Sequence, residues 1–133
     1  MDRFPDKNEL RILFSHAAYQ MAHCFSLRGT EVSHSQAWST EDTQTQLPTA
    51  DVLVISGFWQ DEYLDHANRL RYIQSIGAGY DQFPLDALKA RSISLANATG
   101  VNADAVSQHA MGLILALYRQ LHTGRDNQKQ KIW

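Results

Sequence analysis

The residues best placed to do chemistry form the loop Gly77-Ala78-Gly79-Tyr80-Asp81-Gln82, which directly follows a predicted strand over residues 72–76. The loop begins like the glycine fingerprint of a dinucleotide-binding turn. Gln82 stands where that fingerprint has its third glycine, and the segment 96–100, where an acidic partner for the ribose is expected, contains no acid. The loop is therefore not predicted to bind a dinucleotide.

The same loop could bind a smaller anion. The two glycines flanking Ala78 would let the backbone turn so that successive N–H groups converge on a carboxylate. Ligands of open parallel sheets bind beyond the carboxyl ends of the strands, where this loop is expected to lie. A plain glycine-rich turn without a ligand is the alternative, because such turns are common.

Metal and thiol chemistry are not indicated. Cys24 is the one cysteine of the chain and cannot form an internal disulfide or a cysteine-rich metal site. No pair among the histidines at 16, 23, 34, 66 and 122 has zinc-ligand spacing on a predicted element. We expect His109 to be structural and Asp81 to shape its turn by accepting local N–H bonds.

Alternating strands and helices are predicted to position the loop. Strands are expected over residues 10–14, 30–35 (near an edge), 51–55, 72–76 and 92–96. Helices are expected over residues 17–27, 61–70 and 84–89, with a loop or short exposed helix over 39–49. This order indicates an α/β fold with a doubly wound parallel sheet of about five strands. The continuous apolar run 51–55 predicts that both faces of the sheet are covered.

The last third of the chain is predicted to be one long helix over residues 102–121. One stripe of this helix carries Val106, Ala110, Leu113, Leu117 and Leu121. Further apolar residues, Met111, Ile114, Leu115 and Tyr118, surround most of the circumference. A helix that is apolar all round must be buried on more than one side, which requires a second domain, a second subunit or both.

Composition and charge exclude several classes of protein. The chain has 133 residues and a net charge of −2, so no nucleic-acid partner is indicated. The first ten residues contain no apolar core of a signal peptide. The longest apolar run, residues 110–118, is well short of the ~20 residues that cross a membrane. A cytoplasmic protein of one domain, without a membrane partner, is expected.

Two segments resemble the D-isomer-specific 2-hydroxyacid dehydrogenases. Residues 70–81 match that family's I-x-x-x-G-x-G-x-D loop, and residues 92–111 match a short strand followed by G-V-N-A-x-A-V-A-E-H-A, with Gln108 in place of the acid. The resemblance implies a flavodoxin-like substrate-binding domain over residues 1–101. Residues 102–133 would then form an interdomain and dimerisation helix and the start of a nucleotide-binding domain.

The resemblance also implies roles for individual residues. The backbone amides of Ala78 and Gly79 would hold the substrate carboxylate. Asn102 would lie close to the substrate and the nicotinamide. The alternative role of Asn102 is that of a helix N-cap, and the two roles are compatible. Val106 would lie near the nicotinamide, with an ordinary core position as the alternative.

Phe58 and Trp59 follow the strand 51–55 and could form one wall of the substrate pocket. An ordinary packed aromatic pair is the alternative for these two residues.

The family transfers a hydride between NAD or NADP and a D-2-hydroxy acid or 2-keto acid. Its nucleotide-binding domain and its catalytic Arg, Glu and His follow the long helix, and the run 125–133 resembles the R…W segment just before that domain. The resemblance therefore implies a truncated enzyme that is inactive alone, with no catalytic residue, metal site or bound cofactor in this chain. A homodimer through helix 103–121 is expected. A non-enzymatic flavodoxin-like binding or dimerisation module is the alternative.

Overall fold

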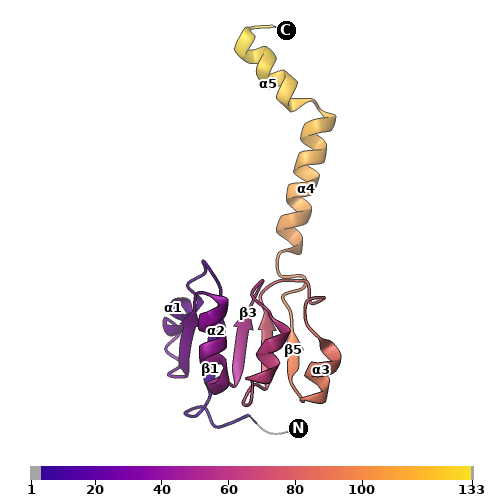
Figure 1. Ribbon diagram of the computed structural model, residues 1–133. Coiled ribbons are helices and arrows are strands. Elements are labelled where there is room, and N and C mark those ends of the chain that lie inside the picture. Colours follow the sequence, from indigo (N-terminus) through magenta and orange to yellow (C-terminus); the bar gives the residue numbers. More distant parts are fainter. Residues whose placement is uncertain (1–3, 133) are drawn as a thin grey trace. The chain divides into compact units, whose positions relative to one another are not determined.

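A five-stranded parallel sheet forms the centre of the first of two units, Met1–Thr99 and Gly100–Trp133 (Figure 1). The computed structural model describes residues 4–132. The strands are β1 (Arg11–Ser15), β2 (Ser33–Ala37), β3 (Val52–Ile55), β4 (Tyr72–Ser75) and β5 (Ser94–Ala96). Their order, β2-β1-β3-β4-β5, confirms the predicted flavodoxin-like sheet and places β2 at an edge.

Helices cover the sheet from both sides. In β1, Phe14 packs on Phe25 of α1 (Met21–Ser26), with ring centroids 5.5 Å apart. The next residue, Ser15, shares a buried hydrogen bond of 2.7 Å with the hydroxyl of Thr43 in α2 (Thr40–Gln46). Successive side chains of a strand point to opposite faces, so α1 and α2 lie on opposite sides of the sheet.

The hydrophobic core lies on the α2 side. It is completed by η1 (Leu47–Thr49), η2 (Asp61–Asp65) and α3 (Leu85–Ala90), the last of which follows Pro84 as predicted. Core side chains that are fully or almost fully buried include Leu13, Leu47, Leu53, Ile55, Tyr63, Ile73 and Leu88. These residues come from β1, β3, β4, η1, η2 and α3, so the strands and the helices on the α2 side form one packed body.

The other face of the sheet is only half covered, which corrects the prediction from residues 51–55. Val52 and Val54 in β3, and their pairing partners Tyr72 and Gln74 in β4, are only partly buried. The alternating residues Leu53 and Ile73 are fully buried. The apolar run correctly indicates a central strand. Within this unit, however, α1 covers only the part of this face formed by β1 and β2, where Phe25 contacts Phe14 and His34.

Two predicted helices are shorter in the structure. Helix α1 begins at Met21 rather than at residue 17, because the backbone N–H groups of Ala18 and Tyr19 both donate to Nδ1 of His16 at 3.0 Å. A side chain that accepts backbone bonds competes with helix formation. The predicted helix 61–70 is wrong beyond residue 65, where η2 ends in successive tight turns.

Residues 39–49 adopt the helical alternative, as α2 and η1. Ser39 caps α2 by accepting a hydrogen bond from the backbone N–H of Asp42 at 3.1 Å. The expectation of an exposed helix is wrong, since Thr43 and Leu47 are completely buried.

The predicted long helix is two helices in the structure. Helix α4 (Ala103–Tyr118) ends where Gln120 adopts a left-handed conformation with φ of 51°, and α5 (Leu121–Gln130) begins at the next residue. A left-handed residue terminates a helix, so Leu121 does not continue the apolar stripe of α4. Trp133, the end of the R…W segment, lies outside the described residues. Among the described helices, none is long and apolar enough to cross a membrane.

A single residue, Asp51, joins the amino-terminal ends of three strands through its carboxylate and its backbone carbonyl. Asp51, immediately before β3, is 1% exposed. It accepts a hydrogen bond from the backbone N–H of Arg11 at 3.0 Å and two from Nη2 of Arg69 at 3.1 Å. Its backbone carbonyl accepts from Arg71, directly before β4, at 2.9 Å. This residue thereby aligns β1, β3 and β4.

We predict that Asp51→Asn destabilises the chain by about 1–3 kcal/mol, because the amide cannot satisfy both Arg11 and the Arg69 guanidinium. Urea unfolding followed by circular dichroism measures the loss. Asp126→Asn, in an ion pair between two exposed side chains, serves as the control and should change stability by less than about 0.5 kcal/mol. Equal effects of the two substitutions would contradict the aligning role of Asp51.

Candidate substrate-carboxylate site

The loop that follows β4 is held by its carbonyl oxygens. The carbonyl of Ala78 accepts hydrogen bonds from Nδ2 of Asn97 at 2.8 Å and from the hydroxyl of Thr99 at 3.2 Å. The carbonyl of Gly77 accepts from the backbone N–H of Ala98 at 3.0 Å. The segment after β5 therefore fixes the loop after β4, so both lie at the carboxyl edge of the sheet.

The fixed carbonyls determine where the amides point. In a trans peptide the carbonyl of one residue and the N–H of the next point in opposite directions. Since the carbonyls of Gly77 and Ala78 face the segment 97–99, the N–H groups of Ala78 and Gly79 face away from it. Neither N–H has an acceptor among the residues that the structure describes, and both residues are exposed. Two adjacent donors are thus available to an anion.

The glycines do not act as the sequence predicted. Neither Gly77 nor Gly79 adopts a positive φ, so the loop is not a nest of alternating left- and right-handed residues. A Cβ atom on Gly79 would meet no heavy atom within 4 Å, and one on Gly77 would make ordinary contacts with the hydroxyls of Ser56 and Ser75. The direction of the N–H groups comes from the hydrogen bonds to the carbonyls instead.

Phe58 and Trp59 lie in the loop after β3 and pack against the core while remaining partly exposed. Gly57, with φ of 70°, provides the turn before them. Trp59 packs against Tyr63 and Phe83, with ring centroids 5.9 and 5.0 Å away. Its indole nitrogen donates to the carboxylate of Asp61 at 2.8 Å. These contacts are typical of an aromatic residue packed against the core. The part of Trp59 that remains exposed lies in the loop at the carboxyl edge of the sheet.

Tyr63 supports this cluster without titrating near neutral pH. Burial raises the pKa of its hydroxyl above the ordinary value, and the hydroxyl donates to the carbonyl of Thr40 at 3.2 Å. The group is therefore a neutral structural donor.

Asn102 and Val106 belong to the second unit. Asn102 occupies the N-cap position of α4, as one prediction had it, but its side chain makes no capping hydrogen bond. Its backbone carbonyl accepts the first helical bond, from Val106 at 2.9 Å. Within the second unit Val106 is exposed, so a core position there is not observed.

Asp81 does not shape its turn as predicted, since its carboxylate accepts no hydrogen bond from any residue within 4–132. Asn97 and Thr99 were missed as site residues. No signal in the sequence marks these contacts, because the two hydrogen bonds to the Ala78 carbonyl join residues 19 and 21 positions apart. Over the described part of the chain, no group of three or more His, Cys, Asp or Glu residues could hold a metal ion.

Comparison with protein families adds independent evidence. A family model for the D-isomer specific 2-hydroxyacid dehydrogenase, catalytic domain, matches residues 12–128. Among curated proteins, the chain is 39% identical over 82 residues to an erythronate-4-phosphate dehydrogenase from Shewanella loihica, covering 60% of this chain. The match spans 22% of the length of that relative.

Solved structures show the same fold. A D-isomer specific 2-hydroxyacid dehydrogenase family protein from Aeromonas salmonicida superposes with a TM-score of 0.74 at 28% identity, over 94% of this chain and 41% of that protein. A D-lactate dehydrogenase from Aquifex aeolicus, solved with NAD and lactic acid, gives a TM-score of 0.70 at 21% identity, over 90% of this chain and 37% of that protein.

Proposed function

Because the chain belongs to the D-isomer-specific 2-hydroxyacid dehydrogenase family, we propose that it supplies the substrate-binding part of such an enzyme. The enzyme would transfer a hydride between NAD or NADP and a D-2-hydroxy acid or its 2-keto acid. In this proposal residues 1–101 form the substrate-binding domain, and residues 102–133 form the interdomain helix and the start of the nucleotide-binding domain.

The observation that carries the proposal is the pair of amides at Ala78 and Gly79. A carboxylate has two oxygens that each accept several hydrogen bonds, and adjacent backbone N–H groups bind it without a charged side chain. The hydrogen bonds from Asn97, Ala98 and Thr99 to the loop carbonyls hold these donors in place before a substrate arrives. A preorganised anchor of this kind orients the substrate for the reaction.

Four further residues receive roles on the same premise. Phe58 and Trp59 would form the wall of the pocket that accepts the substrate side chain. Asn102 would lie near the substrate and the nicotinamide, and Val106 near the nicotinamide. None of these four side chains moves a proton, and in this proposal the acid–base group of the reaction comes from a part of the enzyme outside this chain.

The loop that follows β4 does not fit a dinucleotide. In a dinucleotide-binding turn a helix begins directly after the glycines and directs its amino terminus at the pyrophosphate. Here α3 begins only at Leu85, well after Gly79, and the segment between them is a turn closed by the bond from Phe83 N–H to the carbonyl of Tyr80.

Pyruvate should bind at the loop, because its carboxylate matches the two amides. In nuclear magnetic resonance titrations we expect saturable shifts of the Ala78 and Gly79 amide signals, with a Kd on the order of millimolar for so small a ligand. Acetone, which lacks the carboxylate, should leave both signals in place. Asn97→Ala should weaken pyruvate binding several-fold by removing a bond to the loop. Binding of pyruvate with no shift of either amide would refute the anchor.

Calorimetric titration of the chain with NADH should show no saturable binding at micromolar concentrations, and the chain should not oxidise NADH in the presence of pyruvate. Both results follow because the chain offers the carboxylate anchor without a dinucleotide turn. Saturable binding of NADH at micromolar concentrations would contradict the proposal that this chain lacks a dinucleotide site.

We also propose that α4 joins two copies of the chain. No residue of this helix is buried within its own unit, and its large apolar side chains, from Val106 through Leu113 to Leu117, are more than half exposed. An apolar surface of this extent indicates an interface. A second copy of the chain would supply an identical apolar helix.

Light scattering at high protein concentration should therefore give the mass of a dimer. Leu117→Glu should shift the equilibrium to the monomer, because it places a charge in the interface. Gln108→Glu adds the same charge at a polar residue of the same helix and should retain the dimer. A monomeric wild-type chain would contradict the proposal.

A further inference from the structure

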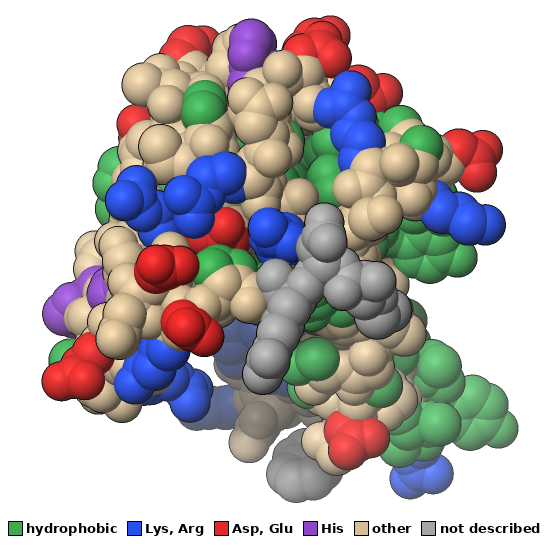
Figure 2. Space-filling view, turned by 90° about the horizontal axis from the view of Figure 1, so that it is seen from below, with side chains coloured by type: hydrophobic (Ala, Val, Ile, Leu, Met, Phe, Trp, Pro, Cys, Tyr) green, Lys and Arg blue, Asp and Glu red, His purple; other side chains and the backbone are tan. Residues whose placement is uncertain are grey.

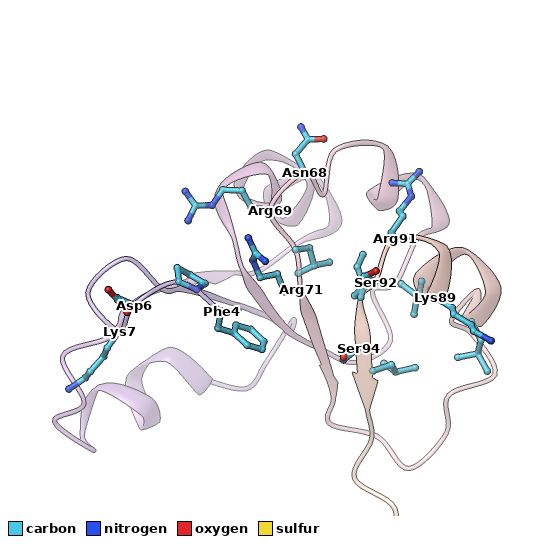
Figure 3. Close-up of a pocket in the computed structure, with 16 residues that line it drawn as sticks. Phe4, Asp6, Lys7, Asn68, Arg69, Arg71, Lys89, Arg91, Ser92 and Ser94 are labelled. Carbon is cyan, nitrogen blue, oxygen red and sulfur yellow. The ribbon is translucent and has the colours of Figure 1, made fainter. Parts of the chain in front are cut away.

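A cavity lies at the other end of β4 from the carboxylate loop. It has a volume of about 1180 Å³ and lies among the segment before β4, the start of β5, α3 and the residues around Pro5. Figure 3 shows the side chains that line it, and Figure 2 looks onto this end of the unit. The cavity belongs entirely to the first unit, and nothing in the carboxylate site accounts for it.

The lining is strongly cationic in a chain whose net charge is −2. Its cationic residues are Lys7, Arg69, Arg71, Lys89 and Arg91, and Asp6 is the one acid among the described residues that line it. Two of the cations have carboxylate partners at the margin. Arg69 is bound to the buried Asp51, and Nη2 of Arg91 lies 3.6 Å from a carboxylate oxygen of the exposed Asp65. When Asp51 and Asp65 are counted with Asp6, the cationic side chains around the cavity still outnumber the carboxylates.

Arg71 is the central residue of this cluster. Its side chain lies between that of Arg69 and the ring of Phe4 (Figure 3). The Nε atom of Arg71 is buried and has no hydrogen-bond partner in the described part of the chain. Buried donors in folded proteins are nearly always paired, so the Nε atom of Arg71 lacks the acceptor that such a donor normally has. A guanidinium presents its donors as a planar fork that fits the oxygens of a phosphate.

Apolar side chains form the rest of the lining. Leu88 and Ile93 are buried beneath it, while Phe4 and Leu85 are about half exposed, at 47% and 49%. Ser92 and Ser94 add hydroxyl groups beside the apolar surface. A fully hydrated inorganic ion would leave this surface unused, whereas a ligand with an apolar group would cover it.

We propose that this cavity binds an organic phosphate, with the phosphate on Arg71 and the apolar group against Phe4 and Leu85. A phosphate monoester carries close to two negative charges and three acceptor oxygens, so it matches several cations better than a single carboxylate does. The volume of the cavity is ample for such a ligand. The site is independent of the proposed hydroxyacid-binding loop.

Phenyl phosphate is a suitable probe, since it combines a phosphate with one aromatic ring. Titration of the whole chain, followed by nuclear magnetic resonance, should give saturable shifts at the amides of Arg71, Ser92 and Leu95, with a Kd on the order of 1 mM or tighter. Inorganic phosphate should bind at least several-fold more weakly, and phenol should not bind. Ala78 and Gly79 should not shift, which separates this site from the carboxylate loop.

Arg71→Met should weaken phenyl phosphate binding about tenfold or more, because it removes the fork while retaining much of the side-chain length. Arg28→Met, at an exposed arginine elsewhere in the unit, is the matched control and should leave binding unchanged. If Arg71→Met fails to fold, Lys89→Met at the rim should still weaken binding several-fold. Absence of saturable binding, equal binding of inorganic and phenyl phosphate, or undiminished binding to the folded Arg71 variant would each overturn the proposal.

Discussion

The buried carboxylate of Asp51 is the interaction on which the arrangement of the sheet depends. The carboxylate accepts hydrogen bonds from the backbone N–H of Arg11 and the guanidinium of Arg69, while the backbone carbonyl of Asp51 accepts one from the backbone N–H of Arg71. These hydrogen bonds align the first residues of β1, β3 and β4 with one another. In parallel strands of nearly equal length, aligned starts also align the ends, so the loops after β3 and β4 emerge together at the carboxyl edge. A charge buried at one end of the sheet in this way positions the candidate site at the other.

The two ends of β4 differ in how they could bind an anion. At the carboxyl end, Ala78 and Gly79 offer neutral backbone donors that are aimed by hydrogen bonds to the carbonyls behind them. At the amino end, Arg71 and its neighbours offer cationic side chains beside an apolar surface. Rigid amides favour one defined carboxylate geometry, which suits an anchor for a reaction. Long charged side chains favour an anion of higher charge and less fixed position.

Much of the fold was predictable because apolar runs and their alternation with polar segments mark parallel strands. The five strands were found within a few residues, and the packed sheet follows from their order. Helix ends were predicted less well, since they depend on single contacts such as those to His16 Nδ1, or on one left-handed residue such as Gln120. The loop 77–79 was identified from its glycines, but its mechanism was not. Asn97 and Thr99 are distant in sequence from Ala78, so only the folded chain reveals that they fix it.

In the proposed function, the amides of Ala78 and Gly79 bind the carboxylate of a 2-keto or 2-hydroxy acid. A crystal structure of the chain with oxamate, an unreactive analogue of pyruvate, tests it most directly. We expect carboxylate oxygens at about 2.7–3.2 Å from both backbone nitrogens, with the bonds from Asn97 and Thr99 to the Ala78 carbonyl retained. Oxamate held elsewhere, with both amides bonded only to water, would contradict it.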